Sequence, residues 1–257
     1  MRGHAVRDHA NGAQGRRRLA LPGLAAAVVA TLGLSLLLAG CQSISGYTKS
    51  SLARIIDASY NAPALNVYIE NTLEASNIGQ GTITPYGGVG PSASAVIKIT
   101  GTSSTNALAS TSATLAVNQA QSVLISDLNA GYQITVLEDQ SVPAPSGHSD
   151  FRILNQAPAT GAIDVYFLAG TTTADYTAAK AVITSLAAGA TSGYISIPSS
   201  TLYMVIAPTG TTLSATAKNI YVSAALPLAG GEVRTVLVLD PVLVTQPVQV
   251  FTVDDVD

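Results

Sequence analysis

The sequence has 257 residues, of which 47% are apolar and only 11% are charged, and its formal net charge is −3. This length and apolar content suffice for one or two hydrophobic cores, and they exclude an intrinsically disordered chain. The balance of 12 Lys and Arg against 15 Asp and Glu argues against nucleic acid as a partner, because phosphates require clustered basic residues.

The amino-terminal residues predict an export signal. Arg16-Arg17-Arg18 precedes an uncharged run, 19–40, that is rich in Leu, Ala and Val, which is the order of a secretory signal. The run ends at Leu38-Ala39-Gly40-Cys41, which resembles the lipobox of bacterial lipoproteins. The resemblance implies that residues 1–40 are a signal peptide and that Cys41, the only cysteine, is lipidated. The alternatives are a single membrane-spanning helix and twin-arginine export.

Lipidation of Cys41 predicts a membrane lipid as partner and an extracytoplasmic place in the cell envelope, because several acyl chains anchor a protein stably. Gln42 stands where an Asp would resemble an inner-membrane retention signal. The outer membrane is therefore favoured if the organism is diderm. Residues 41–50 are expected to be a flexible polar tether, with folded structure from Ser51.

The rest of the chain predicts short β-strands. Apolar residues come in runs or with period two, as in 132–136, 195–197 and 236–239, between clusters of Gly, Pro, Asn and Ser. Such spacing is typical of an all-β sandwich. The Ala-rich stretch 176–188 is predicted to be mainly a strand around 181–183.

An internal repeat predicts two domains. Residues 54–68 align without a gap on 152–166, with matched Arg, Ile, Ala, Val and Tyr. Further matches follow in the same order: Pro85-Tyr86 with Gly193-Tyr194, Val123-Leu124-Ile125 with Val236-Leu237-Val238, and Glu138-Asp139 with Asp254-Asp255. The composition of 142–149 predicts a linker. We expect β-sandwiches over 51–141 and 150–257 that each fold alone, since few charges are available to bridge them.

The repeated pattern resembles the family called domain of unknown function 4397 (DUF4397). It consists of Arg, two aliphatic residues, a loop with Ala-Pro, then a hydrophobic residue, Asn or Asp, Val and Tyr, and later a strand that starts at Tyr86 or Tyr194. The resemblance implies two copies over 51–257, folded as tandem immunoglobulin-like antiparallel β-sandwich domains outside the cytoplasm. It implies no catalytic residue.

The sequence offers few candidates for catalytic or metal-binding residues, and each has a favoured non-functional interpretation. His148-Ser149-Asp150 combines three hydrolase residue types, but consecutive side chains of an extended segment point to opposite faces, so a polar linker end is favoured. The pairs Glu70/Glu74 and Glu138/Asp139 are candidates for glycoside hydrolysis, with surface charge as the favoured interpretation. Asp254, Asp255 and Asp257 could hold calcium, but a solvated acidic tail is favoured.

The residues that recur between the copies favour structural roles. Tyr68/Tyr166 and Tyr86/Tyr194 could stack on sugars, but packing is favoured. Arg54 and Arg152 recur with Asn66 and Asp164, which favours a polar contact that fixes the first strand to its neighbour.

No catalytic, cofactor-binding or metal-binding residue is assigned from the sequence. The predicted function is a non-enzymatic envelope lipoprotein with a structural or binding role. The alternatives are a glycan- or protein-binding adhesion module and a carboxylate-based carbohydrate-active enzyme.

Overall fold

The computed structural model describes residues 50–60, 63–129, 131–242 and 247–255. The predicted signal peptide, Cys41 and almost all of the tether lie outside these ranges. Residues Lys49–Asp257 form one compact unit with its own cores, as expected of a segment that folds independently. This unit is built almost entirely of strands, which confirms the predicted all-β class.

The first sandwich, residues 51–138, consists of two four-stranded sheets. The inner sheet has the order β4-β1-β7-β8 and the outer sheet the order β3-β2-β5-β6. The strands are β1 (Ser51–Asp57), β2 (Leu65–Ile69), β3 (Thr72–Ile78), β4 (Gly87–Val89), β5 (Ser92–Gly101), β6 (Ala107–Leu115), β7 (Ala120–Asn129) and β8 (Gly131–Glu138). β1 pairs with β7 in parallel, whereas an antiparallel sandwich was predicted from the sequence.

The second sandwich, residues 148–254, repeats this strand order. Its inner sheet is β12-β9-β16-β17, with β9 parallel to β16, and its outer sheet is β11-β10-β13-β14, with β15 also paired to β13. The strands are β9 (His148–Gln156), β10 (Ile163–Leu168), β11 (Ile183–Leu186), β12 (Ile195–Pro198), β13 (Thr201–Pro208), β14 (Tyr221–Val222), β15 (Leu226–Pro227), β16 (Val233–Leu239) and β17 (Gln249–Asp254). β9 begins two residues before the expected start at 150.

The Ala-rich stretch begins as a helix, which corrects the strand prediction there. Helix α2 (Thr173–Ala178) starts with a capping box, in which Thr172 and Asp175 each bond the other's backbone N–H. Tyr176 is buried with Leu168 of the outer sheet, so this packing stabilises a helix of under two turns. Strand β11 starts only at Ile183.

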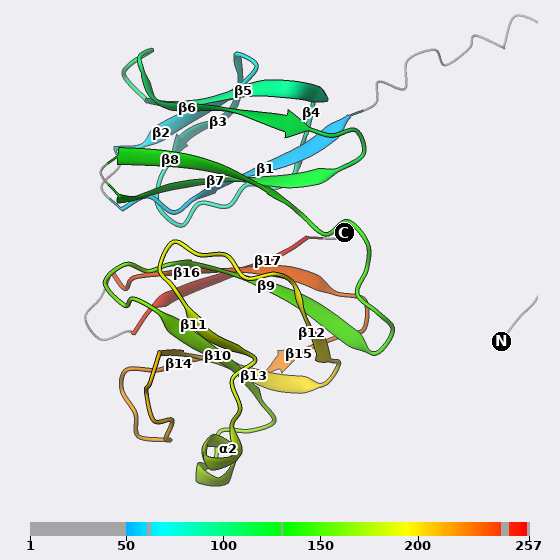
Figure 1. Cartoon of the computed structure of the whole chain (residues 1–257), viewed down its shortest axis with the longest axis vertical. Coiled ribbons are helices and arrows are strands. Elements are labelled where there is room, and N and C mark those ends of the chain that lie inside the picture. Colours follow the sequence, from blue (N-terminus) through cyan, green and yellow to red (C-terminus); the bar gives the residue numbers. More distant parts are fainter. Residues whose placement is uncertain (1–49, 61–62, 130, 243–246, 256–257) are drawn as a thin grey trace, which may run out of the picture. The chain divides into compact units, whose positions relative to one another are not determined.

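The central strands β1, β7, β9 and β16 lie in the two inner sheets, which face each other between the outer sheets (Figure 1). Side chains alternate along a strand, so Ile55 of β1 packs in the core of its own sandwich whereas Ile56 packs between the sandwiches. Ile56 joins a cluster that includes Leu124 of its own sheet and Leu154 and Leu237 of the second sandwich. The two sandwiches therefore share a third hydrophobic core.

Candidate functional site

A buried polar cluster crosses the shared core between the inner sheets. Arg54 of β1, only 1% exposed, donates through Nε to Ser122 Oγ at 2.7 Å within its own sheet. Its Nη1 donates to the carbonyl oxygen of Asp254 at 3.1 Å, and its Nη2 forms a short ion pair with Asp255. Arg54 therefore joins the first sandwich to the last strand of the second.

Arg152 of β9 makes the equivalent bonds from the second sandwich to the first. Its Nε lies 3.2 Å from Thr235 Oγ1 of its own sheet, its Nη1 donates to the Glu138 carbonyl oxygen at 3.0 Å, and its Nη2 pairs with Asp139 Oδ1 at 2.5 Å. Each arginine thus pairs with the aspartate that follows the other sandwich's last strand. Charges do bridge the two sandwiches, which corrects the expectation that few are available.

Two tyrosines complete the cluster. The Tyr86 hydroxyl donates to Asp139 Oδ2 at 2.6 Å, and the Tyr194 hydroxyl donates to Asp255 Oδ2 at 2.7 Å. Their rings lie over the guanidinium groups of Arg54 and Arg152, at 4.8 and 4.9 Å from ring centroid to Cζ. Tyr86 and Tyr194 therefore have a structural role, as predicted: each ring packs over an arginine and each hydroxyl bonds an aspartate of the cluster.

The two carboxylates of the cluster accept hydrogen bonds from other side chains of the same cluster. Asp139 accepts from Arg152, Tyr86 and Ser122, and Asp255 accepts from Arg54, Tyr194 and Thr235. Both oxygens of each carboxylate are occupied, so the arrangement holds two sheets together and offers no oxygen to a substrate or ion.

Raising the pH above 10 is expected to weaken the fold steeply. Burial raises the pKa of Tyr86 and Tyr194 in the folded protein, while the unfolded chain ionises near pH 10. Stability is therefore fully present below pH 10 and is lost as the pH rises toward the folded pKa. Each tyrosine that ionises only when unfolded lowers the free energy of unfolding by about 1.4 kcal/mol per pH unit.

Urea unfolding at a series of pH values from neutral to strongly alkaline measures this slope. Tyr86→Phe and Tyr194→Phe should each make it shallower, whatever they do to stability at neutral pH. An unchanged slope in both variants would contradict the assignment.

The partners predicted for the arginines are wrong. Asn66 and Asp164 lie on the outer sheets, where Asn66 Oδ1 accepts from Asn77 N at 3.0 Å and Asp164 Oδ1 accepts from Ser185 N at 2.7 Å. Asn77 and Ser185 have positive φ angles of 53° and 52°, so both side chains fix the same strained bend in an edge strand. The arginines point away from these sheets.

The aspartates predicted to be solvent-exposed differ from one another. Asp139 and Asp255 are buried at 1% and 4% exposure, so surface charge and a solvated tail are the wrong interpretations for them. Asp254 is exposed and pairs with Arg234 on the surface, and Glu138 is exposed as predicted. Asp257 lies outside the described ranges, and among the residues inside them no three His, Cys, Asp or Glu side chains form a metal-binding group.

His148, Ser149 and Asp150 do not converge, which confirms the prediction from strand alternation. His148 Nδ1 lies 3.3 Å from the Ser146 carbonyl oxygen, Ser149 Oγ donates to the Ala229 carbonyl oxygen, and Asp150 accepts from Gln140. His148 begins a strand instead of ending the linker, because it pairs with Pro198 of β12.

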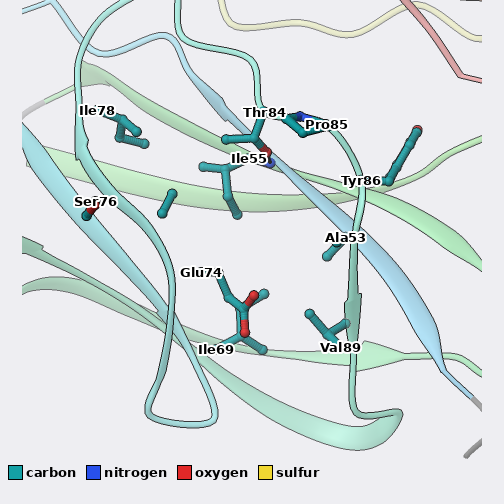
Figure 2. A pocket seen from close by; sticks show the side chains of 12 residues that line it. Ala53, Ile55, Ile69, Glu74, Ser76, Ile78, Thr84, Pro85, Tyr86 and Val89 are labelled. Atoms are coloured by element: carbon teal, nitrogen blue, oxygen red, sulfur yellow. Dashed lines mark hydrogen bonds between the residues drawn. The ribbon is translucent and has the colours of Figure 1, made fainter.

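A pocket of about 350 Å³ opens at the edge of the first sandwich, where β3 and β4 lie at the ends of their sheets (Figure 2). This volume is at the lower end of the range for small-molecule sites. Most of its lining is apolar, and its residues are Ala53, Ile55, Ile69, Glu74, Ala75, Ser76, Ile78, Thr84, Pro85, Tyr86, Gly87 and Val89.

A β-bulge turns Glu74 into this pocket. Val67 of β2 pairs with Ala75, but the next residue, Tyr68, pairs with Leu73, so Glu74 is an extra residue in β3. A bulge of this kind redirects a side chain, and Figure 2 shows Glu74 turned toward the same part of the pocket as Ile69 and Val89. Burial raises the pKa of the Glu74 carboxyl.

Glu70 does not accompany Glu74 in the pocket. Its Oε1 accepts from Val96 N at 2.9 Å at an exposed turn, so the carboxylate pair considered for glycoside hydrolysis is not assembled. The pocket itself was missed from the sequence. The available signal was the size difference between aligned residues, such as Ala53 against Phe151.

The fold and its buried cluster define an all-β protein in which two sandwiches of the same strand order are joined face to face through their inner sheets. Residues 51–166 match the family model described as Domain of unknown function (DUF4397). The match confirms the resemblance predicted for the first sandwich and extends into β10. No curated protein matches the chain.

Proposed function

We propose that the protein is a lipid-anchored component of the cell envelope with a structural or binding role and no catalytic activity. The observation that carries this proposal is the position of Cys41, the only cysteine of the chain, directly after an uncharged apolar run and shortly before the first strand at Ser51. Acylation there would hold the double sandwich at a membrane surface on a short polar tether. Within the described residues no helix is long and apolar enough to cross a membrane.

The non-catalytic part of the proposal is supported by what the titratable side chains do. The buried aspartates of the central cluster are fully bonded to arginine, tyrosine and hydroxyl groups, and the sole histidine after the signal bonds a neighbouring carbonyl. These groups are therefore committed to structure. Gln42 favours the outer membrane if the organism is diderm.

Replacing the lipidation residue tests the anchor. Cys41→Ala is expected to abolish incorporation of a labelled fatty-acid analogue and to leave a precursor that retains residues 1–40, because no other thiol can accept the lipid. Ser43→Ala is the matched control and should be labelled and processed normally. Labelling is followed by gel fluorescence, and mass spectrometry gives the first residue of the processed chain.

Two outcomes would contradict the anchor: absence of label in the wild-type protein, or a Cys41→Ala protein that remains membrane-bound at full precursor mass. The second outcome would support an uncleaved helix. Proteolysis of intact cells then tells which side of the membrane the sandwiches face.

A second candidate, a binding module, is favoured by the apolar pocket of the first sandwich. An enzyme built from carboxylates has less support, because Glu74 has no second carboxylate in the pocket lining.

A further inference from the structure

The two sandwiches differ at one place where their strand pairings are the same. Ala53 of β1 lies opposite Gly87 of β4, and in the second sandwich Phe151 of β9 lies opposite Ile195 of β12. The smaller residues stand in the first sandwich at both positions. The difference falls on the open edge that forms the pocket.

The outer sheet shows the same contrast. Val67 pairs with Ala75 in the first sandwich, whereas Val165 pairs with Ile183 in the second. Ile69 ends β2 where Phe167 occupies the matching position of β10. Four smaller residues therefore line the pocket of the first sandwich at positions where the second has larger ones.

The larger residues close the second sandwich. The rings of Phe151 and Phe167 are in contact, with centroids 4.9 Å apart, and Ile183 and Ile195 pack against the same core. The first sandwich has the same strand order but smaller side chains at these positions. The open space is thus produced by side-chain size and not by a missing strand.

Backbone geometry does not require the small residue at Gly87. A Cβ atom placed there would meet nothing closer than the Ala53 carbonyl oxygen at 3.9 Å, an ordinary contact distance. The glycine therefore keeps space open without serving a turn or a close approach.

The polar groups of the pocket point to one kind of ligand. Thr84 Oγ1 accepts from Ile55 N and the Tyr86 hydroxyl donates to Asp139, so both hydroxyls already bond groups of the protein. Glu74 is half-buried by the bulge that redirects it, and within the described residues it has no hydrogen-bond or ion-pair partner. In the second sandwich the residue before Ile183 is Val182, which carries no charge.

We propose that the pocket of the first sandwich binds a small amphipathic cation, whose aliphatic body fills the space between Ala53, Ala75 and Gly87 and whose ammonium pairs with Glu74. A carboxylate on an apolar wall is stabilised by a cation, and the aliphatic body gains from leaving water. This site is independent of lipidation at Cys41, so failure of either proposal leaves the other standing.

Three eight-carbon probes of different charge test the site: octylammonium, octanol and octanoate. Titration calorimetry on residues 49–257, the compact unit described above, and then on the full chain, is expected to give saturable 1:1 binding of octylammonium. Octanol should bind at least tenfold more weakly, and octanoate should not bind. Equal affinity for octylammonium and octanol, or no saturable binding of octylammonium, would overturn the proposal.

Variants test separately how the charge of Glu74 and the open space of the pocket contribute to binding. Glu74→Gln should weaken octylammonium at least tenfold and leave octanol unchanged, whereas Glu138→Gln, which removes an exposed carboxylate outside the pocket, should change neither. Ala75→Ile introduces the residue of the second sandwich and should abolish binding of both probes.

Gly87→Ile is the second filling variant, and circular dichroism melts establish that each variant is folded. Wild-type affinity in a folded filling variant, or in Glu74→Gln, would assign the binding to another surface and refute the site.

Discussion

Replacing Arg54 by methionine is expected to lower the free energy of unfolding by about 3–5 kcal/mol, because removal of one partner leaves a buried charge uncompensated. Asp255 would lose its ion pair in a site where both side chains are fully shielded from solvent. The substitution keeps most of the apolar stem of the side chain, so the loss reports on the guanidinium. Urea unfolding followed by circular dichroism measures it.

Arg234→Met, on β16 of the second sandwich, is the matched control. Arg234 also pairs with two carboxylates, Glu232 and Asp254, but on the surface, where such pairs contribute roughly 0–1 kcal/mol. A double-mutant cycle of Arg54→Met with Asp255→Asn should recover part of the loss, since the second change removes the unpaired charge. An Arg54→Met protein as stable as Arg234→Met would refute the role given to the cluster.

Separating the sandwiches is expected to destabilise both severely. An isolated first sandwich, residues 50–141, would expose Ile56 and Leu124 and would hold Arg54 and Asp139 without their partners from the second. A loss of about 3–5 kcal/mol corresponds to a fall in melting temperature on the order of 20 °C for a domain of this size. This expectation replaces the sequence-based one, in which each half folds alone.

Thermal melts of the isolated halves and of the intact chain make the comparison. A chain cut by a specific protease at an inserted site next to Val142, which is 67% exposed, serves as control because both halves remain present and can stay docked. Its melting temperature should lie close to that of the intact chain. An isolated half that melts as high as the intact chain would contradict the shared core.

The sequence allowed prediction of those features that depend on local pattern. Strands β1 and β9 were recognisable from aligned runs such as Arg54-Ile55-Ile56 and Arg152-Ile153-Leu154, because a strand buried on both faces reads as continuous rather than alternating. The match of Glu138-Asp139 with Asp254-Asp255 was also visible. It identified equivalent positions without showing what they contact.

The features that were missed depend on how separate elements dock. Asp255 pairs with Arg54 only because two inner sheets face each other, and nothing in the spacing of 201 residues specifies that contact. Helix α2 had its capping signal in Thr172 and Asp175, and its alanines also favour a helix, but the short strands predicted on both sides led to a strand prediction there. The direction of Glu74 depends on a bulge whose register is fixed by the partner strand.

In symmetry terms the contact between the inner sheets is isologous, since Arg54 reaches Asp255 as Arg152 reaches Asp139. A self-complementary surface of this kind is what joins two separate copies of a chain into a two-fold dimer. Here the short linker makes the encounter intramolecular, so its strength does not depend on protein concentration. A substitution on the shared surface acts on both sandwiches at once, whereas one on an outer sheet or its open edge acts on one. The first sandwich can therefore keep an open edge while the second fills the same space, without disturbing the contact that unites them.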